Sequence, residues 1–205
     1  MGFLQSIFGS KEKPINSYDD FWEWFKNYEK TFSNIVKNQG DIEKGFFNKV
    51  SPKLDQLHDG FFFLTGMCDE NTVELVITVE GVVKNIVFAE ELINAAPKLN
   101  GWRFTALKPA ADIRGMGIEM GGYRFSKETL SFYTNDSEHN PDEISLTVVN
   151  QDLNEKAKKM LINGTYIFLD NYLGELNFVT TIDHLNVVGN EETGQELIPI
   201  EKLKD

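Results

Sequence analysis

The stretch Thr72-Val73-Glu74-Leu75-Val76-Ile77-Thr78-Val79-Glu80-Gly81 decides the fold class. Aliphatic residues occupy every odd position from 73 to 79, and this period of two predicts a strand with one face on a core. The apolar run Gly60-Phe61-Phe62-Phe63-Leu64 predicts a strand before it, and a polar turn at residues 69–71 joins the two. We therefore expect a pair of neighbouring strands here.

A helix and a third strand follow. Residues 88–99 carry apolar side chains at helical spacing, interrupted by Pro97, and residues 102–106 alternate again. Residues 60–108 thus predict a ββαβ unit. Residues 129–182 predict the same order, with strands at 130–133 and 144–148, a helix at 151–172 and a closing strand at 176–180.

One segment of the second unit has two interpretations. Asn163-Gly164 is a strong signal for a two-residue hairpin turn, so Lys159 to Leu169 could form two short strands. We favour a helix because the apolar spacing continues across the glycine.

Residues 1–59 predict a helical segment. Ser17 and Asp20 fit a capping box, and an aromatic stripe at helical spacing follows them. Such a stripe more often packs in a core than binds a partner. Asp41 predicts the cap of a second helix, which we expect to break at Ser51-Pro52 and resume to Leu57.

The fold class that follows is α+β, with two ββαβ units forming mostly antiparallel sheet with helices on one side. We expect a single domain, residues 1–205, with no internal linker. Its parts are the N-terminal helical segment 1–59, the first unit 60–108, a connector 109–128, the second unit 129–182 and a C-terminal tail 183–205. In the connector, Gly121-Gly122 predicts a tight hairpin.

Composition indicates a globular protein from a reducing compartment. Hydrophobic residues make up 41% of the 205 residues and charged residues 25%, which is ordinary for such a protein. The single cysteine, Cys68, excludes a disulfide framework. We expect a cytoplasmic protein without a signal peptide or membrane-spanning segment, whose first nine residues could form a short amphipathic helix.

No motif for catalysis, metal binding or nucleotide binding stands out. The glycines of residues 115–122 lack the offsets and the lysine of phosphate-binding loops. His139, beside Glu138 and Asp142, is a weak candidate for a metal ligand, and a buried structural thiol is the favoured role of Cys68 over a nucleophile. We therefore expect no catalytic residues, no cofactor and no metal.

Charge points to the class of partner. The formal net charge is −12, so binding to nucleic acid or to an anionic membrane is disfavoured. A basic protein partner suits this charge better. Because binding residues concentrate on loops, the candidate partner-binding residues are loop acids: Asp69, Glu70, Asp136, Glu138, Asp142 and Glu143.

Two motifs support a family resemblance. One is the strand 73–81 with the helix end Ala96-Pro97-Lys98-Leu99-Asn100-Gly101-Trp102, and the other is Leu173-Gly174-Glu175. They resemble packing signatures of a family of uncharacterised bacterial cytoplasmic proteins, and more distantly the regulator B of ribonuclease E. The resemblance implies an α+β sandwich with no known activity, and it supplies no site residue.

These observations favour a non-catalytic protein-binding or regulatory module of a bacterial cytoplasm, such as a regulator or an immunity-type protein. The alternative is a small-molecule enzyme or sensor whose site is dispersed through the fold. A pocket lined by converging polar groups would favour the alternative, whereas an acidic or aromatic surface would favour the module.

Overall fold

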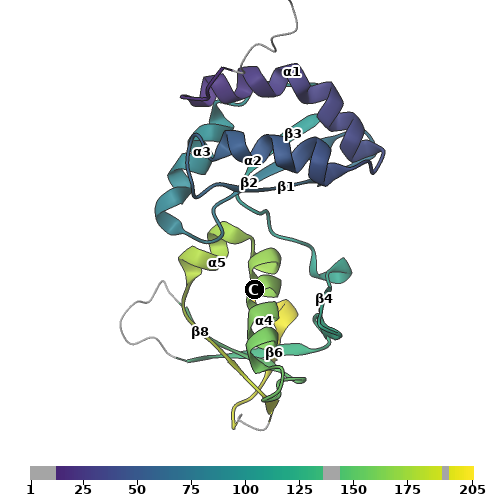
Figure 1. Cartoon of the computed structure of the whole chain (residues 1–205). Coiled ribbons are helices and arrows are strands. Elements are labelled where there is room, and N and C mark those ends of the chain that lie inside the picture. The colour runs from purple at the N-terminus through teal and green to yellow at the C-terminus, as the bar shows by residue number, and fades with distance from the viewer. Residues whose placement is uncertain (1–12, 136–143, 191–193) are drawn as a thin grey trace, which may run out of the picture. The chain divides into compact units, whose positions relative to one another are not determined.

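The computed structural model describes residues 13–135, 144–190 and 194–205, and its architecture is α+β, as the sequence predicts (Figure 1). Contacts divide the chain into two compact units. Unit 1 holds the described residues up to Leu75 together with Glu91–Phe104, and unit 2 holds the described residues of Val76–Glu90 and Thr105–Asp205. The single domain expected from the sequence stays a prediction, which the unfolding transitions of the two units would test.

Helix α1 (Tyr18–Lys37) opens unit 1 with Ser17 as its N-cap, which is the first half of the predicted capping box. The Ser17 hydroxyl accepts a hydrogen bond from the Asp20 amide at 3.1 Å, and the Asp20 carboxylate accepts one from the Asn16 amide at 3.2 Å. The first bond satisfies a backbone donor that a helix start leaves without a partner, and the second ties the residue before the N-cap to the first turn.

The second helical segment differs from its prediction at Pro52. A π-helical turn, η1 (Glu43–Phe47), leads directly into α2 (Asn48–Leu54), which runs through Pro52 and ends at Leu54. The predicted break at Ser51-Pro52 is therefore wrong. Pro52 is the fifth residue of α2, so its missing N–H removes the helical hydrogen bond to the Asn48 carbonyl without ending the helix.

Three strands follow as predicted, β1 (Phe62–Met67), β2 (Val73–Thr78) and β3 (Trp102–Ala106), in the sheet order β1-β2-β3. The Val73 amide donates to the Gly101 carbonyl, and the Leu107 amide donates to the Ile77 carbonyl. Residue numbers rise together along both strands, so β2 and β3 are parallel. Helix α3 (Ile86–Asn94), preceded by the 3₁₀ turn η2 (Val83–Asn85), makes the crossover between them.

Aromatic side chains form the core of unit 1. In Figure 1, α1 and α2 lie over the sheet. The Phe25 ring of α1 lies 5.0 Å from that of Trp102 and 5.6 Å from that of Phe104, and the Phe32 ring lies 4.9 Å from that of Phe46. The aromatic stripe of α1 is thus core, as the sequence favoured.

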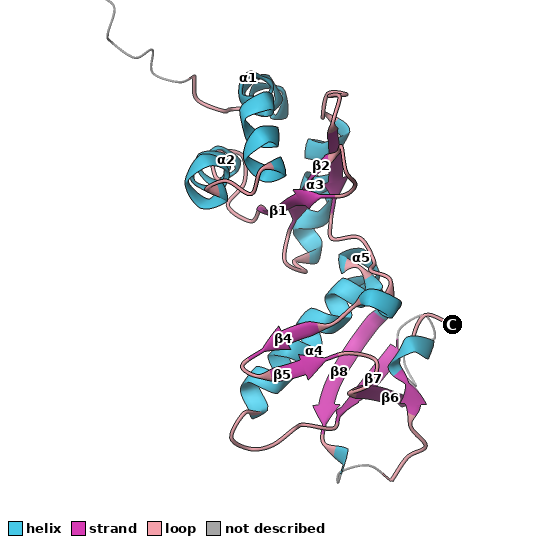
Figure 2. Ribbon diagram, turned by 90° about the vertical axis from the view of Figure 1, so that its right-hand side faces the viewer, coloured by secondary structure: helices cyan, strands magenta, loops and turns pink. Residues whose placement is uncertain are grey.

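Unit 2 contains a four-stranded sheet in the order β8-β7-β6-β9, and Figure 2 shows its three long strands beside α4 (Lys158–Leu173). Strand β6 (Leu130–Asn135) is antiparallel to β7 (Ile144–Asn150) and to the short β9 (Ile198–Pro199). Strand β8 (Ile182–Val188) is parallel to β7, so the second repeat uses the same strand arrangement as the first.

Helix α4 runs through Asn163-Gly164, which confirms the preference for a helix over a hairpin. A Cβ atom added at Gly164 would overlap the ring of Phe125, so this glycine permits a close approach. The helix starts at Lys158 rather than at residue 151, after a polar turn.

The closing strand predicted at 176–180 is wrong, because these residues form helix α5 (Glu175–Thr181) and the strand begins at Ile182. Leu176, Phe178 and Thr180 alternate in sequence, but a seven-residue segment is too short for its period to be decisive. The buried side chain of Glu175, the first residue of α5, is held by hydrogen bonds from residues 78, 79, 81 and 108.

The connector forms the predicted hairpin of β4 (Ile118–Met120) and β5 (Tyr123–Phe125), after the 3₁₀ turn η3 (Ile113–Gly115). Gly121 and Gly122 have φ values of 58° and 83°, which a two-residue type I′ turn requires. After β9, the 3₁₀ turn η5 (Ile200–Lys202) is the last element that the structure describes.

Candidate functional site

Strand β1 presents exposed apolar side chains at an edge of its sheet. Phe62, Leu64 and Met67 are 51%, 48% and 41% exposed. The ring of Phe63 lies 5.4 Å from that of Phe47, so Phe63 faces the helices and its neighbours Phe62 and Leu64 face away. We call Phe62, Leu64 and the following Glu70 the β1 surface, whereas Met67, two side-chain alternations beyond Phe63, belongs to the other face of the strand.

A hollow of about 280 Å³ lies beside the start of this strand. Its lining includes residues 61–63, Phe47 and the carboxylate-bearing Glu43. Asp59, whose side chain is fully exposed, precedes the strand, and the Asp69-Glu70 turn follows it. Acidic residues thus flank an apolar strand.

The structure separates the roles of the two acids predicted in this turn. The Asp69 carboxylate accepts hydrogen bonds from the Asn71 and Thr72 amides, both at 2.8 Å, and these bonds lower its pKa. The Asp69 side chain therefore stabilises the turn that contains it, as the aspartate of an Asx turn does. Glu70 is exposed, so it is the better candidate for a partner contact.

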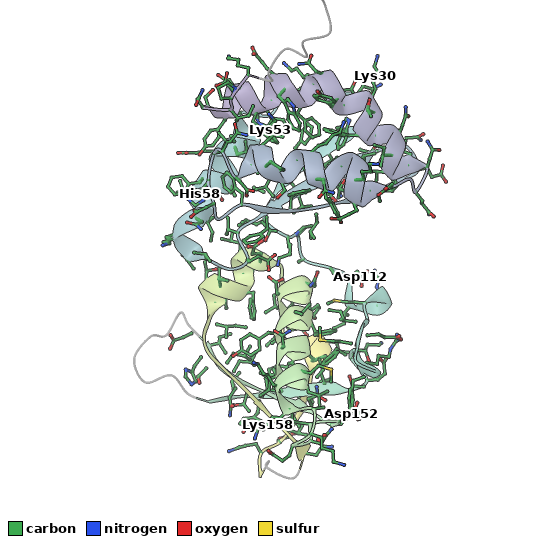
Figure 3. The ribbon with its side chains drawn as sticks, in the orientation of Figure 1. Lys30, Lys53, His58, Asp112, Asp152 and Lys158 are labelled. Atoms are coloured by element: carbon green, nitrogen blue, oxygen red, sulfur yellow. The ribbon has the colours of Figure 1, made fainter. Side chains whose placement is uncertain are left out.

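Several basic side chains of unit 1 are engaged within it. The Lys53 ammonium lies 5.6 Å from the ring centre of Trp24, and that of Lys49 lies 5.1 Å from the ring centre of Tyr28 (Lys53 is labelled in Figure 3). Arg103 binds both carboxylate oxygens of Glu74, at 2.8 and 2.9 Å. Lys49, Lys53 and Arg103 therefore already interact with other side chains of unit 1.

The other predicted acids, Asp136, Glu138, Asp142 and Glu143, lie outside the described residues. Their grouping with Asp69 and Glu70 therefore stays a prediction. Sequence reasoning missed Phe62 and Leu64 as site residues, although a signal existed. The unbroken apolar run at 61–64 lacks the alternation that a strand with one solvated face would show.

A second polar cluster, in unit 2, surrounds the buried carboxylate of Glu175. One carboxylate oxygen accepts hydrogen bonds from the Val79 and Gly81 amides at 3.0 Å. The other accepts from the Thr78 hydroxyl at 2.6 Å and the Lys108 amide at 3.1 Å. Burial alone would raise the pKa of Glu175, but these bonds lower it below its ordinary value.

Lys108 extends this cluster. Its ammonium lies 2.7 Å from the Asp170 carboxylate and 3.5 Å from that of Glu80. Burial opposes the charge of Lys108, yet the bond to Asp170 raises its pKa. Burial and the nearby carboxylates of Glu175 and Glu80 raise the pKa of Asp170.

The cluster holds strained backbone in place. Glu80 and Leu107 have φ values of 50° and 63°, unusual for residues other than glycine, and each adjoins an amide that binds Glu175. The two sequence motifs that carry the family resemblance meet here, since Val79 and Gly81 belong to one and Glu175 to the other. Because the Glu175 carboxylate already accepts hydrogen bonds from these donors, we assign the cluster a structural role.

Cys68 is half-buried and its Sγ lies 3.4 Å from the Thr72 carbonyl, in the same turn as Asp69. The part of the chain that the structure describes contains no group of three or more His, Cys, Asp or Glu residues able to hold a metal ion. Within the same residues, no helix has the length and apolar character needed to cross a membrane. No family model, curated protein or solved structure matches the chain.

Proposed function

We propose that this chain is a non-catalytic protein-binding or regulatory module of a bacterial cytoplasm, and that unit 1 binds its partner along the β1 surface. The observation that carries the proposal is an edge strand with two exposed apolar side chains on one face, Phe62 and Leu64, that leads into an acidic turn. The family resemblance in sequence supports a regulator.

The chemistry of the β1 surface suits an extended, basic segment of a protein. An edge strand has backbone groups that another strand can pair with, and alternate side chains of the added strand enter pockets. Phe62 and Leu64 supply apolar contact, whereas Asp59, Glu43 and Glu70 supply negative charge around it. Lysine or arginine residues beside apolar residues complement this pattern.

The net charge of −12 should also speed association with a basic partner. Such steering is screened over about 8 Å at physiological salt. Association of the purified partner should therefore slow as salt rises, and replacing Glu70 and Asp59 by Gln and Asn should slow it at low salt. A rate that responds to neither change excludes steering.

The test of the binding surface compares two double variants of the full chain. Phe62→Ser with Leu64→Ser removes the apolar contacts of β1, and Val83→Ser with Val87→Ser removes two exposed apolar side chains elsewhere. A partner captured from the host by the wild type is purified, and its dissociation constant is measured for each chain. We expect at least tenfold weaker binding for the β1 variant alone. Equal affinity for all three chains contradicts the proposal.

A second candidate function, a small-molecule sensor, rests on a hollow of about 370 Å³ in unit 2. Ile144, Leu173 and Leu203 form apolar walls, and Asn177, Thr181 and Lys204 bring polar groups to the same hollow. This volume is at the lower end for ligand pockets. Short-chain carboxylic acids are suitable probes, and a thermal shift that Lys204→Met abolishes would support this function over the module.

A further inference from the structure

The basic residues of unit 2 are unevenly distributed. Between Lys127 and Lys202, the only Lys or Arg residues are Lys156, Lys158 and Lys159. Lys158 and Lys159 begin α4, and Lys156 lies in the turn directly before it; Figure 3 labels Lys158. Acidic residues are spread through the same stretch, so this is a local positive region on an acidic protein.

Helix stability does not account for these lysines. Cations are unfavourable near a helix N-terminus, where the backbone already carries partial positive charge. The first turn of α4 contains no acidic residue, and among the described residues no side chain caps it. Lys158 pairs with Glu155 at 3.0 Å, but Lys156 and Lys159 have no carboxylate within 4 Å in the described part of the chain. A position that opposes stability often serves binding.

A large hollow lies beside these lysines. It measures about 820 Å³, and its lining includes Lys156, Ala157, Lys159, Met160, Ile162 and Tyr166. We call it the α4 groove. Between the two lysines and Tyr166, the lining is mainly apolar. An amphipathic segment would place its apolar face against this part of the groove.

Contacts within unit 2 fix both ends of this lining. The Tyr166 hydroxyl donates to the Leu185 carbonyl of β8 at 3.1 Å, and its ring packs edge-on against Phe178 at 6.2 Å. Met160 lies against the tip of the β4–β5 hairpin, so closely that a Cβ at Gly121 would overlap its sulfur. The apolar lining is therefore held in place by other elements of the same unit.

We propose that the α4 groove docks an acidic amphipathic segment of a partner protein. Apolar side chains of that segment would fill the hollow over Met160 and Ile162, and its carboxylates would pair with Lys156 and Lys159. The argument for this occupant is charge complementarity, because the groove is positive on a protein of net charge −12. This surface lies on unit 2 and has the opposite charge to the β1 surface, so it does not depend on the proposed function.

Polyanions without apolar side chains fit this groove less well. A nucleic acid would meet the lysines but leave the apolar hollow unfilled, whereas an amphipathic segment can fill it. An anionic membrane would bring many more negative charges against a protein of net charge −12 than a short acidic segment would. These occupants are therefore tested as alternatives.

The test uses the full chain and four probes. The first is a labelled synthetic helix-forming peptide with Leu at i, i+3, i+4 and i+7 and Glu elsewhere, and the second has Lys in place of each Glu. A single-stranded thymidine oligonucleotide and phosphatidylglycerol vesicles complete the set. We expect the acidic peptide to bind at least tenfold tighter than the basic one, with amide shift changes confined to residues 156–166 and their neighbours in unit 2.

Two matched variants then test the lysines. Lys156→Glu with Lys159→Glu should weaken binding of the acidic peptide at least tenfold and should keep the wild-type circular dichroism spectrum. Lys84→Glu with Lys98→Glu changes the net charge equally at two exposed positions that do not line the groove and should leave binding within twofold. Equal loss in both variants would assign the effect to net charge and overturn the proposal.

The apolar contribution has its own variant and its own contrary outcomes. Ile162→Ser should weaken binding at high salt, where charge pairing is screened. Tighter binding of the oligonucleotide or the vesicles than of the acidic peptide overturns the proposal, and so does equal binding of the two peptides. Failure of these tests leaves the β1 proposal untouched, because the β1 variants keep α4 intact.

Discussion

Replacing Glu175 should destabilise unit 2 more than any surface change. The carboxylate accepts hydrogen bonds from the Thr78 hydroxyl and from three backbone amides. Glu175→Ala leaves these donors without their acceptor, and each unsatisfied buried group costs about 1–3 kcal/mol. Entry of water into the vacated space offsets part of the loss, so we expect a decrease of about 3–5 kcal/mol in the free energy of unfolding.

Glu175→Gln removes the negative charge of the side chain but keeps its size and shape. The amide oxygen can keep the bonds to Val79 and Gly81, but the amide nitrogen then faces the Lys108 N–H, donor against donor. We expect a loss of about 2 kcal/mol, between wild type and Glu175→Ala. Glu196→Gln, at an exposed position, is the control and should change stability by less than about 0.5 kcal/mol.

The assay is urea unfolding followed by two signals. All three tryptophans, Trp22, Trp24 and Trp102, lie in unit 1, whereas Glu175 lies in unit 2. Far-ultraviolet circular dichroism reports on both units, and tryptophan fluorescence reports on unit 1. If the chain is one cooperative domain, Glu175→Ala should shift both transitions together. A shift in circular dichroism alone would show that the units unfold separately.

The same residue predicts a pH dependence. The folded pKa of Glu175 is lowered from its ordinary value of 4.5, so its carboxylate stabilises the fold at pH values above 4.5. That stabilisation is lost as the pH falls from 4.5 through the lower folded pKa. The stability difference between wild type and Glu175→Gln should therefore shrink below pH 4.5. Equal stability of the two proteins at pH 7 would refute the reasoning.

Four further substitutions should have effects that urea unfolding can measure. Gly164→Ala should destabilise unit 2 by about 1–3 kcal/mol despite its better helix propensity, because the new Cβ overlaps Phe125; Phe125→Leu should restore part of the loss, and a stabilising Gly164→Ala would contradict the packing. Lys156→Glu and Lys159→Glu should each stabilise the protein by about 0.3–1 kcal/mol at low salt, because they place negative charge at the start of α4; a loss of stability would show that the lysines support the fold. Ser17→Ala should cost about 1 kcal/mol by removing the cap of α1, and an unchanged midpoint would show that the cap is dispensable.

The spacing of apolar residues predicted those helices and strands that pack on the core through one face. Alternation at 73–79 identified β2, and the aromatic stripe identified α1. It failed at residues 176–180, where the deciding interaction joins Glu175 to Thr78, Val79 and Gly81, about a hundred positions earlier in the chain. No local pattern contains that information.

The candidate site was predictable in part. Loop acids at 69 and 70 follow from turn composition, but only the structure shows that Asp69 is engaged by its own turn while Glu70 is exposed. The exposure of Phe62 and Leu64 depends on where the helices lie over the sheet, which the sequence pattern does not specify. Lys156, Lys158 and Lys159 are close together in the sequence, but the hollow beside them is formed by tertiary packing.

The donors that converge on Glu175 form, in effect, a receptor for a carboxylate, and the chain supplies the ligand itself. A tethered group experiences an effective concentration of at least about millimolar, and more when its tether is rigid. Free carboxylates at lower concentration therefore compete poorly for these amides. The wild-type cluster is thus insulated from the solutes around it. Shortening the side chain to alanine would leave an empty receptor that formate or acetate could enter from solution.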